Sequence, residues 1–334
     1  MASIQSILVY VGVDLVGDAL MKLPFLRALR SGFPDARVTW VAGQDTSVFA
    51  NVMQPAANGL IDEVIERADL GRSASELLRR PMGGRAFDLI IDTQKTLLTT
   101  LVLKRIPHRL FISGTAAFLL SDRRPRRGYR SPSHMVRRML DLVELALGRP
   151  EPTPETISVD MDPAFSRGAG ELLPPGPAFV GLAPGAGGRH KCWPVEKFIA
   201  LARIQEERGR TPVFLIGPQE REWEEWLRVE VPTALFPLQA PGVADRFKGS
   251  PLFTIALGRC LRAAVCNDSG LGHMMASADT ALVSLFGPTS PKKFSPLSRK
   301  LTVLTAQTWG GGDMALIPVD AAAAAVDKAC STPS

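Results

Sequence analysis

An aspartate stands where the first apolar run of the chain ends and the first helical pattern begins. The run SILVYVGV, residues 6–13, predicts a buried strand, and LVGDALMKLPFLRALR, residues 15–30, predicts a helix. Asp18 therefore falls at a strand-to-helix turn, which is where open α/β sheets bind their ligands. Because a helix start attracts anions, a carboxylate at this turn argues against a nucleotide phosphate there.

The stretch AAVCNDSGLGHMMASA, residues 263–278, predicts a second turn of this kind. A buried strand ends at Asn267 and Asp268, and a helix begins at Ser269 and Gly270. Free N–H groups and polar side chains then converge on one crevice, which suits a phosphate, with Asp268 accepting hydrogen bonds from hydroxyl groups. Capping of the helix by Asp268 or Ser269 explains the pattern equally well. His273, one turn later, is either a packed residue or a binding residue.

A glycine-rich turn, LAPGAGGRHKCWP over residues 182–194, lies between another predicted strand and helix. It has neither the spacing of a P-loop nor that of a dinucleotide fold. Lys191, with Arg189 and His190, can contact a diphosphate, although solvated surface charge is the alternative. Glu220, in LIGPQERE, marks one more turn, where an acid either pairs with ribose hydroxyls or stabilises a helix start.

Two polar segments of the first half of the chain contain the remaining candidate functional residues. DTQK, residues 92–95, closes a strand, so we expect Asp92 and Gln94 to face the same cleft between domains as Asp18. SDRRPRRGYRSPSHMVRR, residues 121–138, holds seven arginines, among them Arg126 and Arg127. These arginines either bind phosphates on an acceptor or on lipid head groups, or belong to a solvated, mobile loop.

Composition narrows the class of protein. The chain has 334 residues, 46% hydrophobic and 22% charged, which is typical of a globular enzyme. Its net charge of +6 predicts an anionic partner, and nucleic acid is disfavoured because the aromatic residues are not interleaved with the basic ones. The apolar runs are shorter than the roughly 20 residues that span a bilayer, and we find no secretory signal. Four cysteines without metal or C-x-x-C spacing favour reduced thiols and a cytoplasmic location.

Strand patterns alternate with helical patterns along the whole chain. The predicted strands are Ser6–Val11, Arg37–Ala42, Ile61–Ile65, Phe87–Asp92, Arg109–Ile112, Phe179–Ala183, Val213–Ile216, Ala263–Cys266, Ala281–Phe286 and Leu301–Leu304. Helices are predicted between them, and Pro24 is expected to kink or restart the first. This alternation predicts two Rossmann-like, doubly wound α/β domains.

The proline-rich stretch GRPEPTPET, residues 148–156, reads as a linker between these domains. We expect an N-terminal domain over residues 1–155, a C-terminal domain over residues 156–318, and a final helix or tail over residues 319–334.

Four segments together resemble glycosyltransferase family 9, the ADP-heptose:lipopolysaccharide heptosyltransferases. They are LVGDALMKLPFLRALRSGFPDARVTWVA, FDLIIDTQ, APGAGGRHKCWPVEKFIALA and CNDSGLGHMMASADTALVSLFGPTSP, in the order of the family and spread over most of the chain. The resemblance implies a GT-B fold with two domains facing across a cleft, the acceptor held by the first domain and the nucleotide sugar by the second. It also implies inverting transfer without a metal ion or other cofactor.

The resemblance further implies roles for single residues. Asp18 is similar to the general base of the family, Lys191 to a diphosphate contact, Glu220 to a ribose contact and Asp268 to a ligand of sugar hydroxyls. The implied donor set is completed by Gly185, Ser269, Gly270, His273 and Thr289, and the acceptor set consists of Asp92, Gln94, Arg126, Arg127 and His134. The first loop departs from the family pattern at Gly12, Asp14 and Leu15.

The resulting hypothesis is a glycosyltransferase that moves a sugar, most simply heptose, from an ADP-sugar to a lipopolysaccharide-type or related acceptor. Its expected partners are the nucleotide sugar and an anionic glycolipid or glycan, with peripheral contact to the inner membrane. A family member that binds nucleotides or anions without catalysis is the alternative. A nicotinamide-dependent dehydrogenase is disfavoured, because no G-x-G-x-x-G turn follows the first strand of either half.

Overall fold

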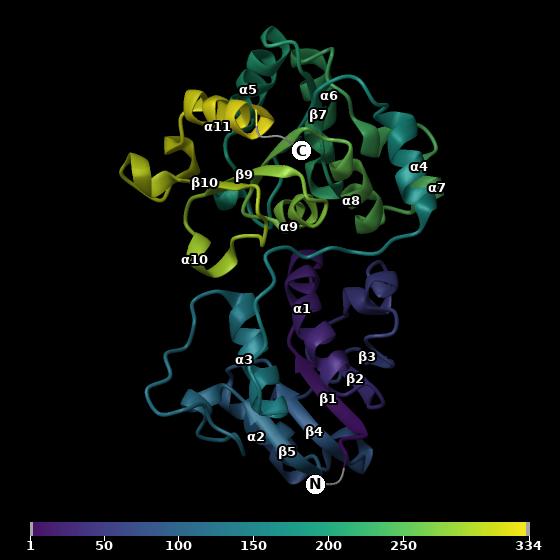
Figure 1. Ribbon diagram of the computed structural model, residues 1–334, viewed down its shortest axis with the longest axis vertical. Helices are drawn as coiled ribbons and strands as arrows, with labels where there is room; N and C mark the ends of the chain where they lie inside the picture. Colours follow the sequence, from purple (N-terminus) through teal and green to yellow (C-terminus); the bar gives the residue numbers. More distant parts are fainter. Residues whose placement is uncertain (1–2, 332–334) are drawn as a thin grey trace. The chain divides into compact units, whose positions relative to one another are not determined.

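The computed structural model describes residues 3–331 and consists of two compact units (Figure 1). Unit 1 is Met1–Thr153 and unit 2 is Pro154–Ser334, so the chain divides inside the proline-rich stretch, just before the expected boundary after residue 155. Within residues 3–331 no helix is long and apolar enough to cross a membrane.

Unit 1 is built on a parallel five-stranded sheet with the order β3-β2-β1-β4-β5. The strands are β1 (Ser6–Val11), β2 (Arg37–Ala42), β3 (Glu63–Ile65), β4 (Phe87–Asp92) and β5 (His108–Ser113). Three of them have the predicted bounds, while β3 begins two residues later than predicted and β5 is longer by one residue at each end. Parallel pairing buries the central strands on both faces, which explains their continuous apolar runs.

Unequal layers cover the two faces of this sheet. On one face α1 (Val16–Gly32) packs against α3 (Met135–Leu147), so closely that a side chain at Gly32 would collide with Leu147. On the other face the core is closed by α2 (Leu97–Leu103) and short 3-10 turns. The predicted restart at Pro24 is wrong, because α1 continues through it as one helix. Pro24 and its neighbours are buried, and this tertiary packing offsets the missing backbone hydrogen bond.

Unit 2 repeats the doubly wound plan with the strand order β10-β9-β8-β6-β7, again with every pair parallel. Its strands are β6 (Phe179–Ala183), β7 (Thr211–Phe214), β8 (Ala263–Asn267), β9 (Ala281–Phe286) and β10 (Leu301–Thr305). Its helices are α4 (Pro163–Leu172), α5 (Val195–Glu207), α6 (Glu224–Glu230), α7 (Val243–Phe247), α8 (Pro251–Arg259), α9 (Gly270–Ser277), α10 (Pro291–Phe294) and α11 (Val319–Ser331). The two parallel α/β sheets confirm the predicted fold class.

Two details of unit 2 differ from or extend the predictions. The helix expected from Glu220 begins as a 3-10 turn, Pro218–Trp223, and becomes α-helical only at Glu224. The C-terminal segment forms α11, which packs on α5 and the sheet and so belongs to the covering layer of unit 2. Residues 332–334 of the expected tail lie outside the described residues.

A buried ion pair anchors the loop between β1 and α1. Asp14 accepts hydrogen bonds from Lys22 Nζ, from Trp40 Nε1 at 2.6 Å and from Ser47 Oγ at 2.8 Å. The Asp14 carboxylate is fully buried and the Lys22 side chain is 11% exposed. The loop that leads to Asp18 is therefore tied both to its own helix and to β2.

A second buried carboxylate holds the end of β4. Asp92 accepts hydrogen bonds from Thr100 Oγ1 at 2.6 Å, from Ser113 Oγ at 2.8 Å and from the backbone N–H of Gln94 at 2.9 Å. Burial raises the pKa of Asp92 above its ordinary value, and the three hydrogen bonds act in the opposite direction. The turn after β4 is thus fixed by a buried carboxyl group with three donors around it.

The first prediction concerns the buried ion pair. Asp14→Leu leaves the Lys22 ammonium buried without its carboxylate, and we expect the free energy of unfolding to fall by about 3–5 kcal/mol. Urea denaturation measures this loss. In the double variant Asp14→Leu/Lys22→Met no charge is stranded, so a large part of the loss should be recovered. A single variant as stable as the wild type would show that the pair does not hold the loop.

The second prediction follows from the raised pKa of Asp92. Its proton is held more tightly in the folded chain than in the unfolded chain, so this group costs stability as pH rises above its unfolded pKa. Asp92→Asn removes the ionisation, and the variant should lose less stability than the wild type as pH rises from about 4, the unfolded pKa, in denaturant titrations.

Asp88, on the same strand, is the matched control with the opposite sign. Hydrogen bonds from the backbone of Gln5 and from Arg109 lower the pKa of Asp88 to about 2. Its stabilising effect is present above the unfolded pKa and is lost as pH falls towards the folded pKa. Asp88→Asn should therefore destabilise the chain at neutral pH and progressively less in acid. Parallel pH profiles for the two variants would contradict both assignments.

Candidate active site

In unit 1 the candidate residues gather at the carboxyl edge of the sheet, where β1 and β4 are neighbours. The loops that follow these strands touch, because Gly12 leaves room for Gln94: a Cβ at Gly12 would lie 3.1 Å from Gln94 Oε1. Asp18 lies in the first turn of α1, directly after the loop that contains Gly12, and is half-buried. The structure therefore brings the turn of Asp18 and the turn of Gln94 together.

The surroundings of Asp18 combine one acid with apolar surface. The N-cap residue of α1 is Leu15, which offers no capping oxygen, so Asp18 is the acidic group at this helix start. Val13 and Leu15 are 42% and 64% exposed. A hydroxyl group that reaches this turn meets a carboxylate beside apolar side chains, which is a suitable setting for proton abstraction.

Asp92 does not lie where we expected it. Its carboxylate is fully buried, and its described hydrogen bonds hold Thr100, Ser113 and the backbone of Gln94. Burial of a carboxylate requires hydrogen-bond donors, and these three groups supply them. Asp92 also contributes to the lining of the small hollow beside Gln94. Gln94, which is half-exposed, is the member of the pair that remains at the edge.

The candidate residues of the basic segment, residues 121–138, lie at two different sites on unit 1. His134 is the N-cap residue of α3, and the start of α3 lies beside Gln94, with which Met135 shares a small hollow. Arg126 and Arg127 instead line a separate hollow of about 760 Å³ with the C-terminal half of α3. The structure therefore groups His134 with the edge of the sheet and places the two arginines elsewhere on unit 1.

In unit 2 a charged cluster forms at the carboxyl edge of the sheet. Lys191 Nζ lies 3.4 Å from Asp268 Oδ2, and Thr289 Oγ1 donates to the same oxygen at 2.7 Å. The three residues come from the loops after β6, β8 and β9, so the fold alone brings them together. Asp268 is positioned by a cation and a hydroxyl, and the Lys191 side chain is 28% exposed.

A hollow of about 300 Å³ adjoins this edge in unit 2. Its lining consists of Gly185, Ala186, Gly187, Pro218, Gln219, Glu220, Ser269, Gly270 and Leu271. Glu220 accepts a hydrogen bond from the backbone N–H of Gly217 at 3.0 Å. Its side chain also packs against the glycine-rich loop, because a Cβ at Gly185 would lie 2.4 Å from the carboxyl carbon of Glu220. Four of the predicted donor residues, Gly185, Glu220, Ser269 and Gly270, thus share one hollow.

The start of α9 holds a buried hydroxyl without a capping bond. Ser269 is the N-cap residue, but its side chain makes no capping bond, and Ser269 Oγ has no hydrogen-bond partner among residues 3–331. No acid lies in the first turn of α9. The capping alternative considered for Ser269 is therefore wrong in this structure. Ser269 and Gly270 line the hollow, and the N–H groups of this helix start suit an anion.

Asn267 has a role that sequence reasoning did not assign. It is fully buried, and its amide donates to the carbonyl of Pro184 at 2.7 Å and accepts from the N–H of Trp193 at 3.0 Å. These bonds hold the glycine-rich loop near both of its ends. Its position at the end of a buried strand was the only available signal. His273 is also buried, at 6% exposed, and is not among the residues that line the hollow.

Within residues 3–331 no group of three His, Cys, Asp or Glu side chains is placed to hold a metal ion. The chemistry that the described residues offer is a carboxylate at one sheet edge and, at another, an ammonium, hydroxyls and backbone N–H groups.

Comparison with known proteins identifies the family of this chain. The model of the family described as Glycosyltransferase family 9 (heptosyltransferase) matches residues 76–314. Lipopolysaccharide heptosyltransferase 2 of Escherichia coli strain K12 is 27% identical over 314 residues, covering 88% of this chain and 86% of that protein.

Two solved structures have the same fold. The glycosyl transferase family 9 protein from Veillonella parvula DSM 2008 is 20% identical, with a TM-score of 0.74 over 99% of this chain and 98% of that one. The E. coli heptosyltransferase WaaC with ADP is also 20% identical, with a TM-score of 0.66 over 97% and 100% of the two chains. Because the family model covers most of its length, this chain belongs to glycosyltransferase family 9 and is a glycosyltransferase of the GT-B type.

Proposed function

We propose that this glycosyltransferase moves a heptose from ADP-heptose to a lipopolysaccharide-type acceptor, with inversion at the anomeric carbon and without a metal ion. The observation that carries the proposal is the contrast between the two helix starts: α1 has an acid in its first turn, whereas α9 has none there, and the acid that precedes α9, Asp268, is paired with Lys191. The donor is supported by a family relative solved with ADP, and the acceptor by relatives named as lipopolysaccharide heptosyltransferases.

The donor is assigned to unit 2. Lys191 and the N–H groups near Ser269 and Gly270 contact the diphosphate, because an ammonium and a helix start both favour negative charge. Glu220, held across the glycine-rich loop, accepts hydrogen bonds from the ribose hydroxyls. Asp268, with Thr289 on the same oxygen, receives the hydroxyls of the transferred sugar.

The acceptor is assigned to unit 1. Asp18 takes the proton of the acceptor hydroxyl while the oxygen attacks the anomeric carbon from the face opposite the diphosphate. The bond from that carbon to the diphosphate oxygen breaks, and ADP leaves with the electron pair, its charge stabilised by Lys191 and the start of α9. Gln94 and His134 lie at the edge that receives the acceptor, and Arg126 and Arg127 contact its anionic groups from their separate hollow.

The third prediction tests the base. Asp18→Asn removes the proton acceptor but keeps the size of the side chain, so turnover should fall by about 10²–10⁴. Sugar transfer is measured by mass spectrometry, and binding of ADP, measured by calorimetry, should stay unchanged. Asp35→Asn removes the same charge from an exposed loop of unit 1 and should keep full turnover. Near-normal turnover of Asp18→Asn would exclude Asp18 as the base. A wild-type chain that binds ADP-heptose but never turns it over would instead favour the alternative of a family member that binds nucleotides without catalysis.

The fourth prediction tests the diphosphate contact. Lys191→Met should weaken binding of ADP about 10- to 100-fold, because hydrogen bonds to charged groups contribute roughly 1.5–3 kcal/mol. Calorimetric titration with ADP and with adenosine measures the effect, and adenosine, which lacks the phosphates, should bind both chains alike. Lys248→Met, which removes an exposed lysine elsewhere on unit 2, is the matched control and should bind ADP like the wild type. Equal losses for ADP and adenosine would contradict the assignment.

A further inference from the structure

One face of unit 1 exposes leucines that nothing in the unit covers. Leu78, Leu97, Leu101 and Leu119 are 87%, 55%, 36% and 61% exposed, and we call them the leucine face. They come from the 3-10 turn Ala74–Leu78, from α2, and from the position after the 3-10 turn Thr115–Phe118. Both turns contact α2, so the four leucines belong to adjoining elements.

The leucine face is the outer side of a thin covering layer. α2 has only seven residues, and its inner side chains Val102 and Leu103 are fully buried in the core beneath the sheet. Leu97 and Leu101, four residues apart, share the opposite side of the same helix. A helix that is apolar on both sides is normally covered on both sides. Among the described residues, 3–331, the other face of the sheet, covered by α1 and α3, has no comparable set of exposed leucines.

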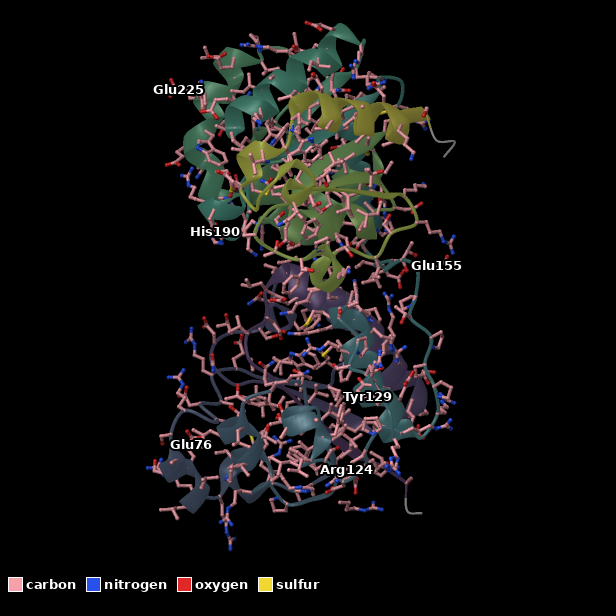
Figure 2. All side chains as sticks on the ribbon, turned by 90° about the vertical axis from the view of Figure 1, so that its left-hand side faces the viewer. Glu76, Arg124, Tyr129, Glu155, His190 and Glu225 are labelled. Atoms are coloured by element: carbon pink, nitrogen blue, oxygen red, sulfur yellow. The ribbon has the colours of Figure 1, made fainter. Side chains whose placement is uncertain are left out.

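Arginines surround the leucine face. Arg79 and Arg80 follow Leu78 directly, Arg105 follows the end of α2, and Arg124 donates to the carbonyl of Leu119 at 3.0 Å. All four are exposed. Figure 2 shows Glu76 and Arg124 in the lower part of unit 1, apart from each other in this view.

The acids of this region are already engaged. Glu76 accepts three hydrogen bonds from the backbone N–H groups of residues 71–73, at 2.7 to 2.8 Å. Asp122 lies 3.6 Å from Lys104 and accepts from the N–H of Phe111 at 2.7 Å. The leucine face therefore presents apolar side chains within a rim that is positive on balance.

A strained turn borders the leucine face. Ala116, Ala117 and Phe118 have φ angles of 49°, 53° and 66°, a left-handed conformation that costs about 1–2 kcal/mol for each such residue. The turn buries Phe118 against Tyr129, with ring centroids 5.6 Å apart, and leaves both alanines and Leu119 at the surface. Strain of this kind persists where the surroundings enforce it, often at functional surfaces.

We propose that the leucine face docks unit 1 on an anionic phospholipid bilayer. Leucines that enter the boundary between head groups and acyl chains, with arginines at the lipid phosphates, are the combination that membrane surfaces attract. A second copy of the chain fits less well, because it would bring the arginine rims of two copies together. The relevance of docking rests on the proposed function: Leu97 follows Gln94 by three residues, at most about 10 Å of chain, so a docked leucine face lies near the acceptor edge.

Flotation with vesicles tests the docking without any use of the transferase activity. The full chain should float with vesicles of phosphatidylethanolamine and phosphatidylglycerol, less so at raised salt, and poorly with phosphatidylcholine alone. Leu97→Gln/Leu119→Gln should lower the partition coefficient about tenfold or more, since each exposed leucine contributes buried apolar area. Val52→Gln/Val229→Gln, which changes two exposed valines elsewhere, is the matched control and should float like the wild type.

The outcomes separate docking from the proposed function. Circular dichroism and binding of ADP, assigned to unit 2, should be the same in all three chains, and so should transfer to a lipid-free acceptor. If the wild type does not float with anionic vesicles, or if the leucine variant floats equally well, the docking proposal is overturned while the transfer reaction stands. A wild-type dimer that does not float and that the leucine substitutions dissociate would assign the face to a second copy instead.

Discussion

The start of a helix that follows a buried parallel strand presents unpaired N–H groups, and these groups must find negative charge or a polar partner. The two units of this chain meet that requirement in different ways. α1 carries a carboxylate of its own, Asp18, in its first turn, whereas α9 has neither an acid there nor a capping bond from Ser269. The first turn of α9 therefore carries no charge that opposes an anion, and Asp268, which precedes it, is paired with Lys191. The assignment of a phosphate-bearing donor to one unit and an uncharged hydroxyl to the other follows from this difference.

Each of the half-buried candidates Asp18, Gln94 and Asp268 stands close to a buried polar residue that fixes its loop. Asp14 precedes Asp18 by four residues, Asp92 precedes Gln94 by two, and Asn267 is the neighbour of Asp268. The buried members have all their described hydrogen bonds within the protein. Satisfied polar groups in a low-dielectric interior hold their partners rigidly. Buried anchors thus position the groups that can touch a ligand.

Most of the fold could be predicted from the sequence, because buried parallel strands appear as apolar runs that alternate with helical patterns. The residues at strand ends could be singled out for the same reason, and Lys191, Asp268 and Thr289 do lie together. The role of a given polar residue could not be predicted, since burial depends on partners far along the chain. Asp14 is buried by Trp40 and Ser47, 26 and 33 residues later.

The same limit applies to Asp92 and to Pro24. The hydroxyls that bind the Asp92 carboxylate belong to Thr100 in α2 and Ser113 in β5, and no sequence pattern around Asp92 predicts these partners. Pro24 remains inside α1 because the packing of neighbouring side chains outweighs one lost hydrogen bond. In both cases tertiary contacts override a local rule.

In a parallel sheet, ligands bind at the carboxyl edge, whereas helices cover the two faces. Unit 1 can therefore bind a ligand at one surface and a partner at another. The carboxyl edge of its sheet is shaped by Asp18 and Gln94, whereas the leucine face is the outer side of α2. The proposed contact of α2 with a lipid surface would leave the edge open. Since α2 begins just beyond the turn of Gln94, a substrate with its lipid part in the bilayer could then present a hydroxyl at that edge. A longer α2 with a polar outer side would cover the sheet equally well, and the exposed leucines are therefore best explained by a partner.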